Sequence, residues 1–220
     1  MNFKQPILLI SLDFELHWGR FDKYALEDYQ AYYQNTLDVI PKFLELFEKF
    51  GIHATWATVG SLLADNWEEW ESFAPETRPR FENPKYSAYE WAKNKPNQSG
   101  LFAPQLAKSV SQTPGQEVGS HTFSHYYTGL KGSDLESFKA DLIASKKITE
   151  AKLGMNPVSL VFPRNQYHPG YIAAAKELGF LNFRTNPKDW FWENTAEETL
   201  LKKIFRTGDT LIPLGKRTSF

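Results

Sequence analysis

Two histidines four positions apart, His121 and His125, are the most chemically suggestive pair in the sequence. Residues at this spacing lie on one face of a helical turn, so both imidazoles can face one divalent metal ion. The chain has five histidines and no cysteine, so a metal site must use imidazole and carboxylate ligands. Two unrelated surface histidines are the alternative, and the spacing alone leaves it open.

Asp13 and Glu15 bring two carboxylates to the end of an apolar run near the start of the chain. Alternate residues of a strand face the same way, so both are expected on one side, where they repel unless a cation lies beside them. One would bind a metal and the other would act as a general base, because a metal lowers the pKa of its water from ~15.7 toward ~7. A solvated strand end or a helix cap is the alternative.

Arg164 and Asn165 follow a second apolar run, Val158 to Pro163. An arginine at a strand end can hold a carboxylate through two parallel hydrogen bonds, which orients that carboxylate. Asp13 is the expected partner of Arg164. A surface cation is the alternative, and nothing in the local sequence decides between them.

The rest of the chain alternates strand-like and helix-like segments, which indicates an α/β fold with parallel strands, either a barrel or an open sheet. Ligands in such folds lie beyond the carboxyl ends of the strands, where the polar residues above fall. The expected strands are Ile7–Phe14, His53–Val59, Gln116–Ser120, Val158–Pro163, Phe180–Thr185 and Thr210–Leu214. The expected helices are Leu37–Phe50, one opened by a capping box at Ser133–Glu136 with Leu135, Phe138, Leu142 and Leu153 on its inner face, Pro169–Leu178 and Glu197–Phe205.

The length of 220 residues suits a single domain, 1–220. The stretch 66–100 is polar, contains four prolines and interleaves aromatic residues such as Trp67, Trp70 and Tyr89. We expect a long excursion carrying short helices, because the aromatic residues argue against disorder. Aromatic residues make up 15% of the chain, which suits carbohydrate binding but also an ordinary core.

Charge and hydropathy exclude some partners. With 25 basic and 26 acidic residues and no long run of one sign, the chain gives no reason to expect nucleic acid or an anionic membrane surface. The N-terminal apolar run is too short for a signal peptide or a membrane span. A cytoplasmic location is the prediction, and a processed precursor would look the same.

The order of these motifs resembles the polysaccharide deacetylase family, the NodB-type carbohydrate esterases. Asp13-Phe14-Glu15, then His121-Thr122-Phe123-Ser124-His125, then Arg164 after a strand carry the resemblance, which extends from Ile7 to about Leu214. It implies a distorted, incomplete (β/α) barrel. It also implies removal of acetyl groups from an N-acetylated sugar or polysaccharide, with Zn²⁺ as the metal and Co²⁺, Mn²⁺ or Ni²⁺ as alternatives.

The same resemblance implies roles for individual residues. Asp13 would be the general base, oriented by Arg164. The metal ligands would be Glu15, His121 and His125. The substrate-binding residues would be Asn165, Asp189 and Trp190.

Three departures from the family pattern bear on activity. Phe14 separates the two acidic residues, where many members have adjacent aspartates, and Glu15 stands in place of the ligand Asp. Gln166 occupies the place of the usual proline in the arginine motif. No histidine follows His168, whereas the family places a general-acid histidine near its C-terminus, so the chain reads as a shortened form in which His17 or His168 would have to substitute.

Two other functions remain open at this stage. One is hydrolysis of another C–N bond, such as a cyclic amide, by the same metal chemistry. The other is carbohydrate binding without catalysis, in which the aromatic residues of 67–91 contact the glycan.

Overall fold

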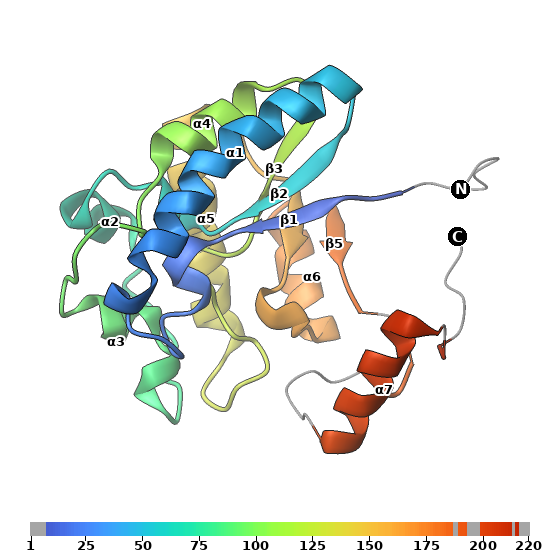
Figure 1. Ribbon diagram of the computed structural model, residues 1–220. Helices are drawn as coiled ribbons and strands as arrows, with labels where there is room; N and C mark the ends of the chain where they lie inside the picture. Colours follow the sequence, from blue (N-terminus) through green and yellow to red (C-terminus); the bar gives the residue numbers. More distant parts are fainter. Residues whose placement is uncertain (1–7, 187–188, 193–198, 213, 216–220) are drawn as a thin grey trace.

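The computed structural model describes residues 8–186, 189–192, 199–212 and 214–215. It contains five parallel strands whose order in the sheet follows their order in the chain (Figure 1). They are β1 (Ser11–Phe14), β2 (Ala54–Thr58), β3 (Gln116–Ser120), β4 (Ser159–Val161) and β5 (Asn182–Arg184). The sheet curls into a half-barrel, which confirms the incomplete (β/α) barrel.

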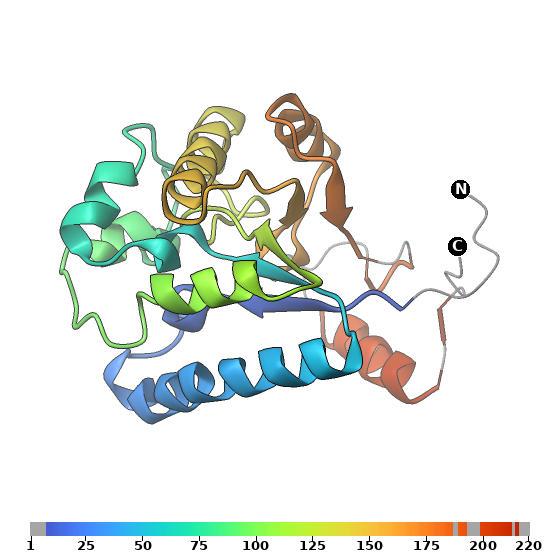
Figure 2. The same cartoon turned by 90° about the horizontal axis from the view of Figure 1, so that it is seen from above.

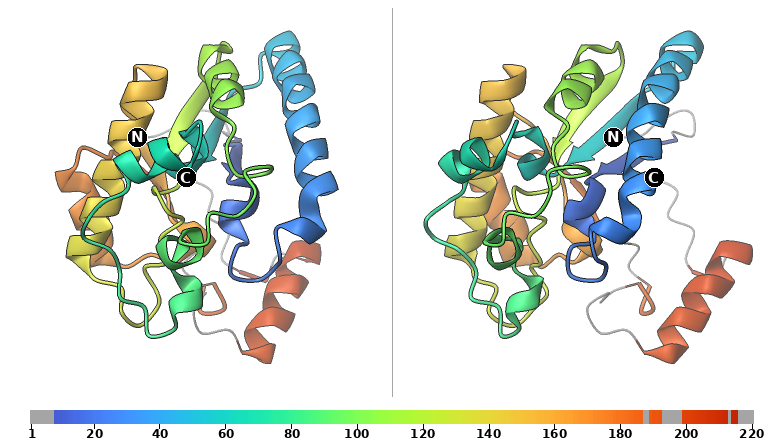
Figure 3. Two further views of the ribbon diagram at one scale, coloured as in Figure 1. Left: turned by 90° about the vertical axis from the view of Figure 1, so that its left-hand side faces the viewer. Right: turned by 60° about the vertical axis from the view of Figure 1, so that its left-hand side comes forward.

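Helices between the strands cover the outer face of the sheet. Figure 2 and Figure 3 show them following one another around the strands, and neighbouring helices contact each other. They are α1 (Gln30–Phe50), α4 (Pro104–Gln112), α5 (Leu135–Leu153) and α6 (Pro169–Glu177). Because all four neighbouring strand pairs are parallel, the carboxyl ends of the strands come together at one edge.

The core lies between this sheet and its helices. Each large apolar side chain buried there contributes about 1.5–3 kcal/mol relative to remaining in water. Fully or nearly fully buried members include Trp56, Val118, Phe138, Leu142, Ile148 and Leu160. The strand residues among them, Trp56, Val118 and Leu160, face the helices, and their burial specifies the register that pairs Asp13 with Ala57 and Thr58 with Ser120.

Several predicted elements differ from those observed. β1 begins only at Ser11, and Leu8 and Leu9 are each 85% exposed, so the predicted burial of that run is wrong; Ile7 lies outside the described residues. α1 begins at Gln30, well before Leu37, because its first turns carry polar residues that hide the helical period. The predicted strand Gln116–Ser120 matches β3, whereas the predictions for β2, β4 and β5 extend one or two residues beyond the observed strands at each end.

The helix α5 begins one residue later than predicted, because the capping box Ser133–Glu136 places the N-cap at Ser133 and the first helical residue at Asp134. The carboxylate of Asp134 accepts a hydrogen bond from the Ser137 backbone N–H at 2.8 Å, so Asp134, and not Ser133, is the N-cap. Phe138 and Leu142 are buried as expected, whereas Leu135 is 46% exposed.

The last described helix, α7 (Leu200–Leu211), confirms the predicted helix Glu197–Phe205 from Leu200 onward and extends into the predicted strand Thr210–Leu214. Thr199 caps it by accepting a hydrogen bond from the Lys202 N–H, and the helix continues through Gly208 to Leu211. The predicted strand Thr210–Leu214 is therefore wrong, because its first residues are helical. A glycine costs a helix only about 1 kcal/mol, so Gly208 does not end it. Residues 197–198 and 213 lie outside the described residues.

The stretch 66–100 carries the short helices that were expected, α2 (Trp67–Phe73) and α3 (Ala88–Ala92), with a 3-10 turn between them. Its aromatic side chains face inward. Trp67, Trp70 and Tyr89 are at most 6% exposed, and Trp70 stacks on Trp18 with ring centroids 5.9 Å apart. These rings form a core beneath the strand ends and offer no open platform to a glycan.

Among the described residues, no helix combines the length and the apolar character that a bilayer span requires.

Candidate metal centre

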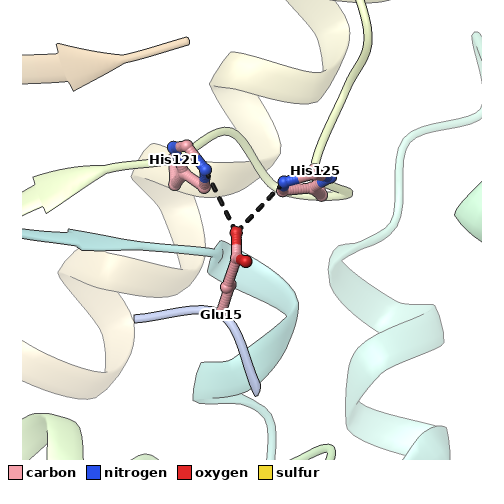
Figure 4. Close-up of side chains that lie close together, drawn as sticks. All are labelled: Glu15, His121 and His125. Carbon is pink, nitrogen blue, oxygen red and sulfur yellow. Dashed lines mark ion pairs between the residues drawn. The ribbon is translucent and has the colours of Figure 1, made fainter. Parts of the chain in front are cut away.

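Three side chains from distant parts of the chain meet at the carboxyl ends of β1 and β3 (Figure 4). Glu15 follows β1 directly, His121 follows β3 directly, and His125 lies four residues further on. The Oε2 atom of Glu15 lies 3.3 Å from Nε2 of His121 and 3.1 Å from Nε2 of His125. Both imidazoles are at most 3% exposed. The geometry therefore brings the three predicted ligands together.

The backbone that positions these groups is irregular. His121 to His125 do not form the helical turn expected from their spacing: Thr122 has φ of 65° and His125 has φ of 56°. Leu16, Arg164 and Asn165 also have positive φ, and all five follow strands β1, β3 or β4. Such conformations cost of order 1–3 kcal/mol each for a non-glycine residue and cluster at functional sites. The two imidazoles converge because of this loop.

The hydrogen bond on the far side of His121 sets its tautomer. Nδ1 of His121 lies 2.8 Å from the carbonyl oxygen of Val161, which can only accept, so Nδ1 carries the proton and donates. In the neutral ring, Nε2 then presents a lone pair to Glu15. A lone pair and a carboxylate oxygen at this distance repel unless a cation or a proton lies between them. Metal-binding histidines are oriented in the same way.

The ionisation of the cluster suits a cation. Burial opposes the charged form of Glu15, but hydrogen bonds and positive charge from protonated His121 and His125 outweigh it and hold its pKa well below its usual value; when both imidazoles are neutral, a bound cation would supply that positive charge. Burial lowers the pKa of His125, although Glu15 acts in the opposite direction. Glu15 is therefore an anion and His125 is neutral near pH 7. Nδ1 of His125 has no hydrogen-bond partner among the described groups.

The donor set fits a divalent transition metal. In a tetrahedral zinc site with bonds of ~2.0–2.1 Å, neighbouring ligand atoms lie ~3.3 Å apart. The observed separations of 3.1 and 3.3 Å around Oε2 of Glu15 match that spacing. Two neutral imidazoles and one carboxylate leave a fourth position open, as catalytic zinc sites do.

Asp13 does not join this group, contrary to the expectation that it shares a face with Glu15. β1 ends at Phe14, and Glu15 has φ of −132° and ψ of −18°, so the alternation of a strand stops before it. The carboxylate of Asp13 is instead held by Arg184, whose Nη1 lies 2.8 Å from Oδ1 and whose Nη2 lies 3.1 Å from Oδ2. Asp13 and Glu15 both border a cavity of about 430 Å³ between β1 and α1, but His121 and His125 are not among its lining residues, so this cavity does not join Asp13 to the three ligand atoms.

Arg164 has a different partner from the one expected. Its Nη2 donates to Oδ2 of Asp22 at 2.6 Å, so the predicted pair with Asp13 is wrong. The reason is its left-handed backbone, with φ of 55°, in the 3-10 turn after β4. The guanidinium lies 4.2 Å from the ring centroid of Tyr127, whose ring meets that of His125 edge to face. Arg164 therefore contacts the Tyr127 ring, which in turn contacts the ring of His125.

The remaining predicted residues lie around this site or away from it. Oδ1 of Asn165 accepts a hydrogen bond from Nε of Arg184 at 3.2 Å, so Asn165 supports the Arg184–Asp13 pair. Trp190 is 48% exposed and contacts Phe205 of α7. Asp189 accepts a backbone hydrogen bond from Trp192 at 2.8 Å. The substrate-binding roles of Asp189 and Trp190 stay predictions.

Neither histidine considered as a substitute acid fits that role. His17 is fully buried, with Nδ1 2.8 Å from the Tyr33 hydroxyl, and burial lowers its pKa to about 4, so it is neutral near pH 7. His168 caps α6, where Nδ1 accepts a hydrogen bond from the Gly170 N–H at 3.2 Å. The general acid therefore has no assignment among the described residues.

Two residues that matter here were missed in the sequence. Arg184 is the last residue of β5 and the last but one of the predicted strand 180–185, so the rule that selected the polar residues at the other strand ends would have found it. Asp22 had no signal, because it lies in a turn far in sequence from Arg164. Only the packing of the side chains brings those two together.

Comparison with known proteins gives the family. The model of the family described as polysaccharide deacetylase matches residues 27–183, more than half of the chain. The chain therefore belongs to the polysaccharide deacetylase family. The matched region contains both histidines and Arg164 but begins after Asp13 and Glu15. The roles assigned to these two carboxylates therefore depend on the geometry of the site alone.

Solved structures share the fold. A protein from Mycobacterium smegmatis described as a polysaccharide deacetylase is 15% identical, with a TM-score of 0.57 over 85% of this chain and 54% of its own. A de-N-acetylase from Aggregatibacter actinomycetemcomitans is 16% identical, with a TM-score of 0.50 over 82% of this chain and 63% of its own. A CE4-family pseudoenzyme from Bacillus anthracis is 15% identical, with a TM-score of 0.46 over 80% and 42%.

These alignments concern only part of each relative. The chain spans about half of the length of the first of these structures. Among the curated proteins compared with the sequence, none matches it.

Proposed function

We propose that this chain is a metal-dependent deacetylase that removes the acetyl group from an N-acetylated sugar or polysaccharide. One observation carries the proposal: Oε2 of Glu15 lies within 3.3 Å of Nε2 of both His121 and His125. The family membership supports the reaction, and the donor set supports a divalent metal, with Zn²⁺ as the first choice and Co²⁺, Mn²⁺ or Ni²⁺ as alternatives.

In this proposal, Glu15, His121 and His125 hold the metal. When bound, a divalent metal supplies Lewis-acid chemistry, which polarises a carbonyl oxygen and makes hydroxide available near neutral pH. The hydrogen bond from His121 to the Val161 carbonyl keeps the ring turned toward Glu15. Burial of both imidazoles limits the access of bulk water to the ligand atoms.

Asp13 is the proposed general base, which takes the proton of the attacking water. It lies at the carboxyl end of β1, two residues before Glu15, and the two terminal nitrogens of Arg184 fix the direction of its two oxygens. Nη1 of Arg184 also donates to Oγ of Ser11 at 3.0 Å, and its Nε donates to Oδ1 of Asn165 at 3.2 Å. Arg184 therefore replaces Arg164 in the proposed role of orienting the base.

An acetate-release assay on chitooligosaccharides tests the reaction. The purified chain is stripped with a chelator, reloaded with zinc and assayed beside the stripped form. We expect acetate from the reloaded protein and none from the stripped one. Asp13→Asn should retain zinc and lose about 10²–10⁴-fold in rate, as expected when a general base is removed.

Two results would oppose the proposal. A reloaded protein that contains stoichiometric zinc but releases no acetate from any N-acetylated sugar would remove the deacetylase assignment. Release of product from cyclic amides alone, with no acetate from sugars, would favour hydrolysis of a different C–N bond.

A further inference from the structure

A fully buried carboxylate, Asp141 on α5, contacts the loop that joins His121 to His125. Its Oδ1 accepts hydrogen bonds from the backbone N–H of Phe123 at 2.7 Å and of Ser124 at 3.4 Å. Its Oδ2 accepts from the hydroxyl of Ser124 at 2.5 Å. Three of its contacts therefore lie on the two residues at the middle of the loop.

The fourth contact comes from a different part of the chain. The hydroxyl of Tyr89, on α3, donates to Oδ2 of Asp141 at 2.6 Å. Tyr89 belongs to the stretch 66–100, whose aromatic residues were considered above as a glycan platform and proved to be buried. Asp141 thus joins that stretch to the loop of the two histidines.

Phe123 is held on every side at this point. Its N–H donates to Asp141, and its carbonyl accepts from the Ser61 N–H at 2.9 Å. Its ring packs against those of Trp70 and Tyr89, at centroid distances of 5.9 and 6.5 Å, and these two rings also contact each other. Phe123 is the middle residue of the segment from His121 to His125. These contacts therefore hold the backbone that carries both imidazoles.

The loop needs such support, because its backbone is strained. Thr122 and His125 both have positive φ, which non-glycine residues keep only when their surroundings enforce it. A loop freed from Asp141 can relax toward ordinary φ values, and this relaxation turns the two Nε2 atoms away from Glu15. The hydrogen bonds to Asp141 are thus coupled to the geometry of the three ligand atoms.

We propose that Asp141 is a positioning residue for the metal centre, and that Tyr89 ties it to the stretch 66–100, which serves as a buttress for the histidine loop. The inference rests on the proposed function only for the presence of a metal at Glu15, His121 and His125. It concerns affinity for that metal and makes no statement about the sugar.

The test compares zinc affinity among full-length variants at 25 °C by competition with a chromogenic chelator. Asp141→Asn should weaken zinc binding about 10–100-fold, the usual cost of losing a group that orients metal ligands. Tyr89→Phe should weaken it less, by several-fold, because it removes one donor of four. The visible spectrum of the Co²⁺-loaded Asp141→Asn protein should differ from that of the wild type, since the spectrum reports ligand geometry.

Tyr126→Phe is the matched control. Tyr126 is as buried as Tyr89, but its hydroxyl bonds to Ser137 and Asp134 and not to Asp141. Its loss should lower the melting temperature of the metal-free protein and leave the zinc dissociation constant within twofold. A purely structural role for Asp141 predicts the same pattern for Asp141→Asn.

The outcomes are separable from those of the deacetylase assay. Folded Asp141→Asn and Tyr89→Phe proteins that bind zinc as tightly as the wild type would overturn this inference and leave the deacetylase proposal intact. A wild type that binds zinc but releases no acetate would overturn the deacetylase proposal and leave the inference about Asp141 intact. A wild type without zinc affinity would overturn both.

Discussion

The two terminal nitrogens of Arg184 contact both carboxylate oxygens of Asp13, at 2.8 and 3.1 Å, across 171 positions of the chain. This pair joins the last strand of the sheet to the first, because β5 and β1 lie at opposite ends of the strand order. Curling of the half-barrel is what brings these two edges within reach. The orientation of the proposed base is therefore a property of the barrel.

Arg184→Lys should lower the rate of deacetylation. A lysine keeps the charge but has one nitrogen, so it cannot grip both oxygens of Asp13, and we expect kcat to fall about 10–100-fold from the loss of orientation. Zinc content should stay at the wild-type level, because Arg184 contacts none of the three metal ligands in the described ion pairs. Kinetics and metal analysis on the same preparation check both points, and an unchanged kcat would remove Arg184 from this role.

Replacement of a ligand should abolish stable metal binding. His121→Ala removes one of three donors and leaves an incomplete ligand set of Glu15 and His125, so zinc affinity should fall by at least about 100-fold. His53→Ala is the control, since His53 is an exposed histidine away from the cluster. Metal content after dialysis measures the difference. Stoichiometric zinc in the His121→Ala protein would contradict the proposed ligand set.

The pair of Asp22 and Arg164 should contribute to stability. The Asp22 side chain is 2% exposed and that of Arg164 is 26% exposed, so removal of one partner leaves a poorly solvated charge. We expect Asp22→Asn to lower the free energy of unfolding by about 2–4 kcal/mol. Urea denaturation of Asp22→Asn, Arg164→Met and the double variant gives the coupling energy, and a value near zero would show that the pair adds nothing.

The stability difference between wild type and Asp141→Asn should depend on pH. Burial raises the pKa of Asp141 above its usual value of 3.8, although its hydrogen-bond donors act in the opposite direction. Between 3.8 and the raised pKa, the folded protein keeps a proton that the unfolded chain has lost, so stability falls as pH rises through this window. The Asp141→Asn protein has no carboxyl group at this position, so its stability does not fall for this reason. The pKa of Tyr89 is raised well above 10, so its hydroxyl keeps its proton throughout.

Urea denaturation of the metal-free proteins at several pH values from 4 to 8 measures this difference. Other titrating groups are common to both proteins and cancel. The wild type should lose stability relative to Asp141→Asn as the pH increases from about 4. A difference that is constant, or that grows in favour of the wild type, would contradict the raised pKa of Asp141.

Much of the site was readable in the sequence. The spacing of His121 and His125, and the acidic residues after an apolar run, selected the three groups that meet in the structure. The alternation of strands and helices indicated the parallel α/β fold. These signals are local: strand ends and short spacings are set by neighbouring residues, so a single sequence carries them.

The partners of the charged groups depended on the tertiary structure. Arg164 was expected to hold Asp13, yet it pairs with Asp22, while Arg184 holds Asp13. Each choice depends on backbone angles after a strand and on the curl of the sheet, which no local pattern records. The same holds for Asp141 and the histidine loop, because a buried carboxylate takes whichever donors the packed helices bring to it. The sequence by itself determined which groups reach the strand ends, and the tertiary structure decided which of them face each other.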